Sequence, residues 1–265
     1  KNKNSLFLKD IVLEKNIYAT EKLSEAIAPF IFYVTPAQNF REIISAHKKY
    51  IDKKCEIVIC SKGIEISSGK LLSDIINSIL PNINYYILSG PSFAHEVANN
   101  KPAALVISSK NIKNSIKVSN YISSKNFRLY PSDDIIGVQL GGAIKNIYAI
   151  SSGIVSGLNY GENAVAAILT RAISEMVRIS IALGGNKESI FGLSGVGDIL
   201  LTCTSKHSRN FTLGVAIGEG DKIEQIIENR KTIAEGYYTS KAIYNLIKEL
   251  EIDTPILNSV YNILF

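Results

Sequence analysis

The chain has 265 residues, of which 46% are hydrophobic and 20% are charged, and its formal net charge is +5. This composition supports a sizeable core and excludes extensive disorder, and the length fits one large domain or two modest ones. The lysines are scattered rather than gathered with aromatic residues, which argues against nucleic acid and favours a small phosphorylated partner. No uncharged apolar run of membrane-spanning length is free of Gly, Ser and Asn, so we expect no membrane insertion.

The cysteines and the single methionine bear on where the protein works and where it begins. Cys55, Cys60 and Cys203 are odd in number and lack paired metal-binding spacing. We therefore expect no metal site and a reducing, cytoplasmic setting. Because the first residue is Lys1 and the only methionine is Met176, we expect the chain to begin downstream of the start of its gene.

Between about residues 30 and 130, short β-rich runs alternate with amphipathic stretches. The expected strands are Phe30–Val34, Glu56–Cys60, Tyr85–Leu88, Ala104–Ile107 and Phe127–Tyr130. The expected helices are Phe40–His47, Leu71–Ile79 and Ile112–Ile122. This alternation predicts an α/β fold with a largely parallel sheet and helices on both faces.

Beyond Pro131 the strand pattern stops and the remaining chain has helical periodicity. Helices are expected at Asp134–Gly157, Ala164–Leu183, Phe211–Gly218, Ile223–Asn229 and Gly236–Leu250, with a last apolar segment from Ile256. We therefore expect a sheet-containing domain over residues 1–131 and an all-α domain over residues 132–265.

One lysine stands alone in an apolar, glycine-bearing helix. In the run IIGVQLGGAIKNIYAI, from Ile135 to Ile150, Lys145 is the only charged residue. An ammonium removed from water has a lowered pKa, which would make it a proton donor or acceptor near neutral pH. The alternative is a lysine whose stem packs on apolar neighbours while its ammonium reaches water, and the residues leave both open.

Two further runs follow predicted strands, at the edge of the sheet where ligands bind. The run CSKGIE carries Lys62, which could meet an anion or could be a solvated loop lysine. The run LSGPSFAHE carries Gly90, which permits a tight turn, and Ser92, which we expect to cap a helix beginning at Phe93. Free amides at that helix start could bind an oxygen-rich ligand, and an ordinary capped turn is the alternative.

A glycine-rich run, GLSGVGDILLTCTSKHSRN, carries the remaining polar candidates. Glycines precede Asp198, and Thr202 lies one helical turn further on. A polar cluster follows later in the run, at Ser208, Arg209 and Asn210. The aspartate could hold a catalytic lysine in place, and the forked donors of arginine suit a phosphate dianion. Helix capping by Asp198 and a solvated arginine are the alternatives.

Several motifs in register resemble the bacterial-type NAD(P)-dependent glycerol-3-phosphate dehydrogenases. They are SGPSFA, LGGAIKN, GVGDILLTCTS with its following SRN, and IAEG at Ile233–Gly236. The resemblance extends from about Ile17 to Phe265. It implies a Rossmann-like dinucleotide-binding domain followed by an all-α substrate domain, with NAD or NADP as cofactor. The implied reaction interconverts dihydroxyacetone phosphate and sn-glycerol 3-phosphate, which supplies phospholipid synthesis.

The resemblance also implies roles for individual positions. Lys145 would be the general acid/base at the C2 oxygen, with Asp198 and Lys62 as its catalytic neighbours. The implied substrate-binding positions are Lys62, Gly90, Ser92, Lys145, Asn146, Asp198, Thr202, Ser208, Arg209 and Asn210. The implied cofactor-binding positions are Ala94, Arg209, Ile233 and Glu235.

The sequence departs from that family in one important respect. The GxGxxG loop that cradles a pyrophosphate is absent from these residues, and we expect it in a first βαβ unit upstream of Lys1, with a further segment after Phe265. Two other classes stay open, namely a cofactor-incompetent fragment that binds a phosphorylated ligand and a related hydroxy-acid dehydrogenase. The choice between NADH and NADPH is also open, as is the oligomeric state, although uncovered apolar helices allow a homodimer.

Overall fold

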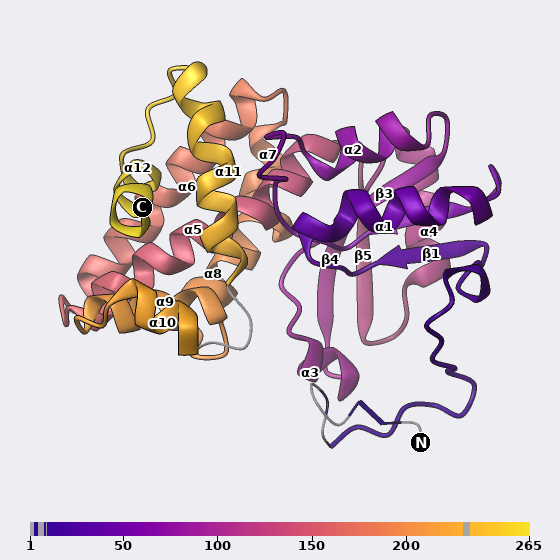
Figure 1. Cartoon of the computed structure of the whole chain (residues 1–265), viewed down its shortest axis with the longest axis horizontal. Coiled ribbons are helices and arrows are strands. Elements are labelled where there is room, and N and C mark those ends of the chain that lie inside the picture. Colours follow the sequence, from indigo (N-terminus) through magenta and orange to yellow (C-terminus); the bar gives the residue numbers. More distant parts are fainter. Residues whose placement is uncertain (1–2, 5–7, 9, 230–233) are drawn as a thin grey trace.

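The computed structural model describes residues 3–4, 8, 10–229 and 234–265, and a sheet-containing half lies beside a helical half (Figure 1). The strands of the described residues are β1 (Phe30–Tyr33), β2 (Glu56–Ile59), β3 (Asn84–Ser89), β4 (Ala103–Ser108) and β5 (Phe127–Ser132). They form one sheet in the order β1-β2-β3-β4-β5, in which only β3 and β4 pair antiparallel. The predicted α/β fold with a largely parallel sheet is confirmed, and the strand ends differ from prediction by one or two residues.

Different helices bury the two faces of the sheet. Ile57 and Ile59 of β2 pack in one apolar cluster with α1 (Phe40–His47) and α2 (Leu72–Ile79). Val58 packs in another cluster with α4 (Ile112–Ile122) on the opposite face. Because successive residues of a strand point to opposite faces, a strand covered on both sides is apolar along most of its length, as in the EIVI of β2.

The helical half is built around one buried helix. Its elements are α5 (Ile135–Gly157), α6 (Glu162–Ala182), α7 (Lys187–Phe191), the π-helix η4 (Leu193–Gly197), α8 (Asp198–Cys203), α9 (Arg209–Gly218), α10 (Ile223–Asn229), α11 (Glu235–Glu249) and α12 (Pro255–Leu264). Helix α5 is buried without a break from Gly137 to Gly153, and the other helices pack around it (Figure 1). None of the described helices is both long and apolar enough to cross a membrane.

Some short elements were not predicted from the sequence. They are α7, η4 and α8, together with 3-10 turns at Leu23–Glu25, Ala37–Asn39 and Lys48–Tyr50, whereas the helix expected from Phe93 is present as α3 (Ala94–Ala98). Helices of five or six residues show too little periodicity to be recognised, and the glycines of η4 favour a loop when read alone. Residues of α7, η4 and α8 are buried, so packing against the rest of the helical half supports these three elements.

Buried carboxylates fix the start of two helices in the helical half. Asp134 caps α5, since its Oδ1 accepts from the Gly137 amide at 2.8 Å, and its Oδ2 accepts from the Asn186 amide at 2.9 Å. The side chain therefore ties the start of α5 to the loop after α6. Glu175 of α6 accepts from the amide of Ile256 at 2.7 Å, in the first turn of α12. Such contacts satisfy amides that a helix leaves unpaired at its start.

Close contact between α5 and α9 depends on glycine, and we expect Gly214→Ala to destabilise the fold. A Cβ on Gly214 would lie 2.0 Å from the Ile150 carbonyl oxygen, which belongs to the backbone of α5. Alanine favours an exposed helix by about 1 kcal/mol, but overpacking costs about 1–3 kcal/mol, so a net loss is expected in chemical denaturation. Gly197→Ala is the control, because its Cβ would meet a side chain at an ordinary 3.6 Å. Equal stability of the two variants would contradict this account.

Candidate active site

A polar cleft of about 310 Å³ lies where β1 and β2 end, between the sheet and the helical half. Its lining comes from the residues after β1 and β2 and from α5, α9 and α11. These residues are Val34, Thr35, Pro36, Cys60, Ser61, Lys62, Lys145, Asn146, Arg209, Asn210 and Glu235. Ligands of open α/β sheets bind at this carboxyl edge of the strands.

Lys145 projects from the middle of α5 and is only 7% exposed. Its Nζ donates to Asp198 Oδ1 at 2.5 Å and to Thr202 Oγ1 at 2.8 Å. The Thr202 hydroxyl in turn donates to Asp198 Oδ1 at 3.4 Å. The ammonium therefore does not reach bulk water, and two side chains of α8 fix its position.

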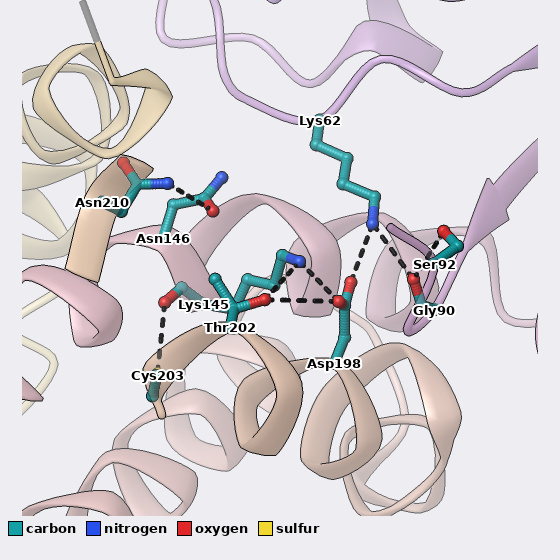
Figure 2. Close-up of polar contacts among 9 residues, drawn as sticks. All are labelled: Lys62, Gly90, Ser92, Lys145, Asn146, Asp198, Thr202, Cys203 and Asn210. Atoms are coloured by element: carbon teal, nitrogen blue, oxygen red, sulfur yellow. Dashed lines mark hydrogen bonds and ion pairs between the residues drawn. The ribbon is translucent and has the colours of Figure 1, made fainter. Parts of the chain in front are cut away.

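A second lysine reaches the same carboxylate from the sheet-containing half. Lys62 Nζ donates to Asp198 Oδ2 at 2.8 Å and to the Gly90 carbonyl oxygen at 3.2 Å (Figure 2). Asp198 is 1% exposed and therefore does not cap a helix toward solvent. Two ammonium groups thus share one buried carboxylate, which leaves this part of the cleft with an excess of positive charge.

The surroundings of Lys145 bring the pKa of its ammonium closer to neutral pH. Burial lowers the pKa of the Lys145 ammonium, the Lys62 charge lowers it further, and Asp198 opposes both, which leaves a pKa of about 8. An amine with this pKa holds or releases a proton readily near neutral pH. The cysteine in the same cleft is different, because burial raises the pKa of the Cys60 thiol to about 12, and at neutral pH it remains a thiol.

Two adjacent glycines allow the backbone to close around Lys145. A Cβ on Gly141, one turn before the lysine, would lie 2.4 Å from the Ser194 carbonyl oxygen of η4. A Cβ on Gly142 would lie 2.4 Å from Ser89 Oγ at the end of β3. The glycine pair therefore lets η4 and β3 approach α5, and η4 leads directly into Asp198. A π-helical turn beside a reactive group is a frequent feature of functional sites.

The polar cluster predicted around Arg209 divides into structural contacts and one exposed charge. Ser208 caps α9, since its Oγ accepts from the Phe211 amide at 3.2 Å. Asn210 donates to Asn146 Oδ1 at 2.9 Å and accepts from the Gly236 amide at 2.9 Å, which joins α5, α9 and α11. Arg209 is exposed and lines the cleft, where its guanidinium can meet an anion.

The strand-end turn corrects one prediction. Ser92 does not cap a helix, because α3 begins at Ala94 and the Ser92 hydroxyl donates instead to the Gly90 carbonyl oxygen at 3.2 Å. Gly90 has a φ of 143°, and a Cβ there would lie 3.0 Å from the Leu105 Cα, so the turn requires glycine. Ala94 is exposed and lies outside the lining of the cleft. Ile233 lies outside the described residues.

The cleft contains buried polar atoms that a ligand could satisfy. Thr35 Oγ1 and Glu235 Oε2 are buried without a hydrogen-bond partner, and both residues line the cleft. Burial raises the pKa of the Glu235 carboxyl, and the charge of Arg209 opposes this rise. Buried polar atoms are normally paired, so these two mark a place for a polar ligand. In the part of the chain that the structure describes, no group of three or more His, Cys, Asp and Glu side chains could hold a metal ion.

Sequence reasoning missed Thr35, which lines the cleft, and Gln38, Arg41 and Glu65, which contact one another or the loop that carries Lys62. Glu65 falls in the quoted run CSKGIE, but no pattern in the sequence pairs it with an arginine 24 residues earlier. Thr35 directly follows the predicted strand Phe30–Val34, and its position before Pro36 was the only signal that it lies at the ligand-binding edge.

Comparison with known proteins assigns the chain to a family. Models described as the N-terminus and the C-terminus of NAD-dependent glycerol-3-phosphate dehydrogenase match residues 1–115 and 134–265. Glycerol-3-phosphate dehydrogenase (NAD(P)+) of Clostridium tetani is 42% identical over 267 residues, covering 100% of this chain and 76% of that protein. The crystal structure of glycerol-3-phosphate dehydrogenase from Coxiella burnetii is 35% identical with a TM-score of 0.95, covering 99% of this chain and 81% of that one. The chain belongs to the NAD-dependent glycerol-3-phosphate dehydrogenase family.

Proposed function

We propose that this chain interconverts dihydroxyacetone phosphate and sn-glycerol 3-phosphate with NAD or NADP. Family membership supports the reaction, and the observation that carries the mechanism is the Lys145–Asp198–Lys62 cluster. A ketone becomes an alcohol when hydride reaches carbon and a proton reaches oxygen. The cleft holds a buried ammonium with a pKa of about 8 that can deliver this proton.

The residues of this chain have separate roles around the C2 carbon of the substrate. In reduction, Lys145 Nζ gives its proton to the C2 oxygen, and in oxidation the neutral amine takes the hydroxyl proton. Asp198 and Thr202 orient the amine by their hydrogen bonds. The Lys62 ammonium, held on the other oxygen of Asp198, stabilises the negative charge that develops on the C2 oxygen. Arg209 binds the phosphate away from the reacting carbon, which fixes the substrate for reaction.

The residues present fit the reactive end of a nicotinamide dinucleotide. Thr35 after β1 and Glu235 of α11 carry the buried polar atoms that lack partners, and together with Ser61 after β2 they would hold this end at the sheet edge. The bound dinucleotide supplies hydride to C2 in reduction and accepts it in oxidation. The cofactor role of Ile233, which lies outside the described residues, and that of Ala94 rest on the family resemblance.

The assignment of domains and biological setting belongs to the same proposal. Residues 1–131 would form the dinucleotide-binding domain and residues 132–265 the substrate domain, and the end of the last strand at Ser132 supports this division.

A cytoplasmic location is supported by the three free cysteines. A supply of glycerol 3-phosphate to phospholipid synthesis follows from the reaction. A homodimer is supported by exposed apolar side chains such as Phe191 and Ile181.

Reduction of dihydroxyacetone phosphate by NADH or NADPH tests the reaction, and Arg209→Ala tests the phosphate site. Because a charged hydrogen bond contributes about 1.5–3 kcal/mol, we expect this variant to raise the KM for dihydroxyacetone phosphate about 10- to 100-fold. Turnover of dihydroxyacetone, which has no phosphate, should hardly change. Lys206→Ala removes an exposed cation three residues away and is the matched control. An unchanged KM in the Arg209 variant would refute the phosphate role.

A further inference from the structure

The loop after β2, residues 61–71, carries Lys62 and is anchored in both halves of the molecule. Ile64 is fully buried and packs, with Leu71, in the apolar core of the helical half. These two residues also form an isolated antiparallel bridge across the loop. Lys62 is two residues before this anchor, so the position of its ammonium depends on where the loop is held.

Side chains of the 3-10 turn Ala37–Asn39 and of α1 hold the same loop from the sheet side. Gln38 Nε2 donates to the Ile64 carbonyl oxygen at 2.8 Å, and the Ile66 amide donates to Gln38 Oε1 at 3.0 Å. Arg41 donates through Nε and one terminal nitrogen to the two oxygens of Glu65, both at 2.7 Å. Ser68 also donates to the Glu65 carboxylate. We name Gln38, Arg41 and Glu65 the loop clamp.

The loop clamp is built from contacts that are costly to break. Glu65 is 4% exposed, and a buried carboxylate is tolerated when it is paired and hydrogen-bonded. The hydrogen bonds from Arg41 hold the pKa of Glu65 below its ordinary range, so the carboxylate stays charged. The side chain of Gln38 replaces a backbone partner for Ile64 and Ile66, much as a neighbouring strand would. The clamp therefore fixes the loop backbone on both sides of Glu65, at Ile64 and Ile66, and Lys62 lies two residues before this fixed point.

We propose that Gln38, Arg41 and Glu65 are positioning residues that hold the Lys62 ammonium against Asp198 and thereby tune Lys145 for proton transfer. None of the three acts on the substrate in this account, because each acts through Lys62. The inference rests on the proposed function for its catalytic meaning. The charge coupling from the loop clamp to Lys145 can be measured without any substrate.

The direction of the coupling follows from the charges around Lys145. The groups that face it are Asp198 and Cys203 of α8 and Lys62 of the loop, with Arg209 and Glu235 further along the cleft. If the loop loosens, the Lys62 charge withdraws and the Asp198 carboxylate is left to Lys145 alone. Both changes stabilise the protonated form of Lys145, so both raise its pKa. A looser loop also admits water, which acts in the same direction.

The test is a carbon NMR titration of the protein with lysine labelled at Cε, in which Lys145→Met assigns the Lys145 signal. Lys62→Met should raise the titration midpoint of Lys145 by about one pH unit. Glu65→Gln should raise it by about half a unit, and Gln38→Ala should raise it as well. Adding Glu65→Gln to Lys62→Met should produce no further shift, because the clamp acts only through Lys62.

Glu175→Gln is the matched control, since Glu175 is also buried and hydrogen-bonded but lies in the helical half, away from the cleft. It should leave the midpoint of Lys145 unchanged. An unchanged midpoint in folded Glu65→Gln and Gln38→Ala proteins, alongside a clear shift in Lys62→Met, would overturn the inference. A further shift in the double variant would also overturn it. Failure of the wild-type protein to reduce dihydroxyacetone phosphate would instead refute the proposed function, because the titration contains neither substrate nor cofactor.

Discussion

Lys145→Met is expected to lower kcat for the reduction of dihydroxyacetone phosphate by about 100- to 10,000-fold, the usual contribution of a general acid. Methionine keeps a buried apolar side chain at this position of α5 and removes only the amino group that carries the proton. Substrate affinity should change little, because the phosphate contact through Arg209 is retained. Comparison of kcat and KM with the wild-type enzyme checks this expectation.

The pH dependence of the wild-type enzyme gives an independent check on the same residue. Reduction needs the protonated amine, so its kcat should fall as the pH rises through about 8, the pKa of Lys145. Oxidation needs the neutral amine, so its kcat should fall as the pH drops through the same value. Lys145→Met should lose both dependences. Turnover within tenfold of wild type in this variant would remove Lys145 from the chemistry.

Asp198→Asn is expected to impair both activity and stability. It removes the only carboxylate bonded to the two ammonium groups of Lys62 and Lys145 among the described contacts. Because the Asp198 charge raises the pKa of Lys145, its loss lowers this pKa further. The protonated amine becomes scarce at neutral pH, so reduction should slow and its pH optimum should shift toward acid.

The stability of Asp198→Asn should itself depend on pH. Removing one partner of a buried pair costs about 3–5 kcal/mol, and partial exposure of Lys62 places this site near the lower value. In the variant, the pKa of Lys145 is lower in the folded protein than in the unfolded chain. The free energy of unfolding therefore increases with pH, as the buried amine loses its proton. Thermal unfolding at pH 7 and pH 9 measures the difference. Asp253→Asn, at an exposed ion pair, is the control and should unfold like wild type.

Elements with clear periodicity were predicted well from the sequence. The bounds of α1, α4 and α10 agree with prediction residue by residue, because each shows apolar positions at helical spacing. The antiparallel pairing of β3 with β4 could not be predicted, since strand direction leaves no local pattern. Helix η4 was also missed, because its glycines favour a loop until α5 packs against them.

The candidate site shows the same division between local and long-range information. The isolation of Lys145 in an apolar helix, and the glycines before Asp198, were visible in the sequence as signs of unusual chemistry. The partners of these residues could not be predicted, because Lys62 and Asp198 are 136 residues apart in the chain. The pairing of Glu65 with Arg41 could not be predicted either, because no sequence pattern has that spacing. The resemblance named the residues around the cleft but not the loop clamp that supports them.

The sequence by itself determined the alternation of strands and helices, the change to an all-helical second half and the isolated lysine, since these depend on periodicity and composition within short windows. Only the tertiary structure decided that two ammonium groups share one carboxylate and that the pair of Arg41 with the buried Glu65 anchors the loop of Lys62. The physical reason is that charge pairing depends on which faces meet when the chain is packed. Burial of those faces depends on the whole molecule, so a short window of sequence does not reveal the pairing.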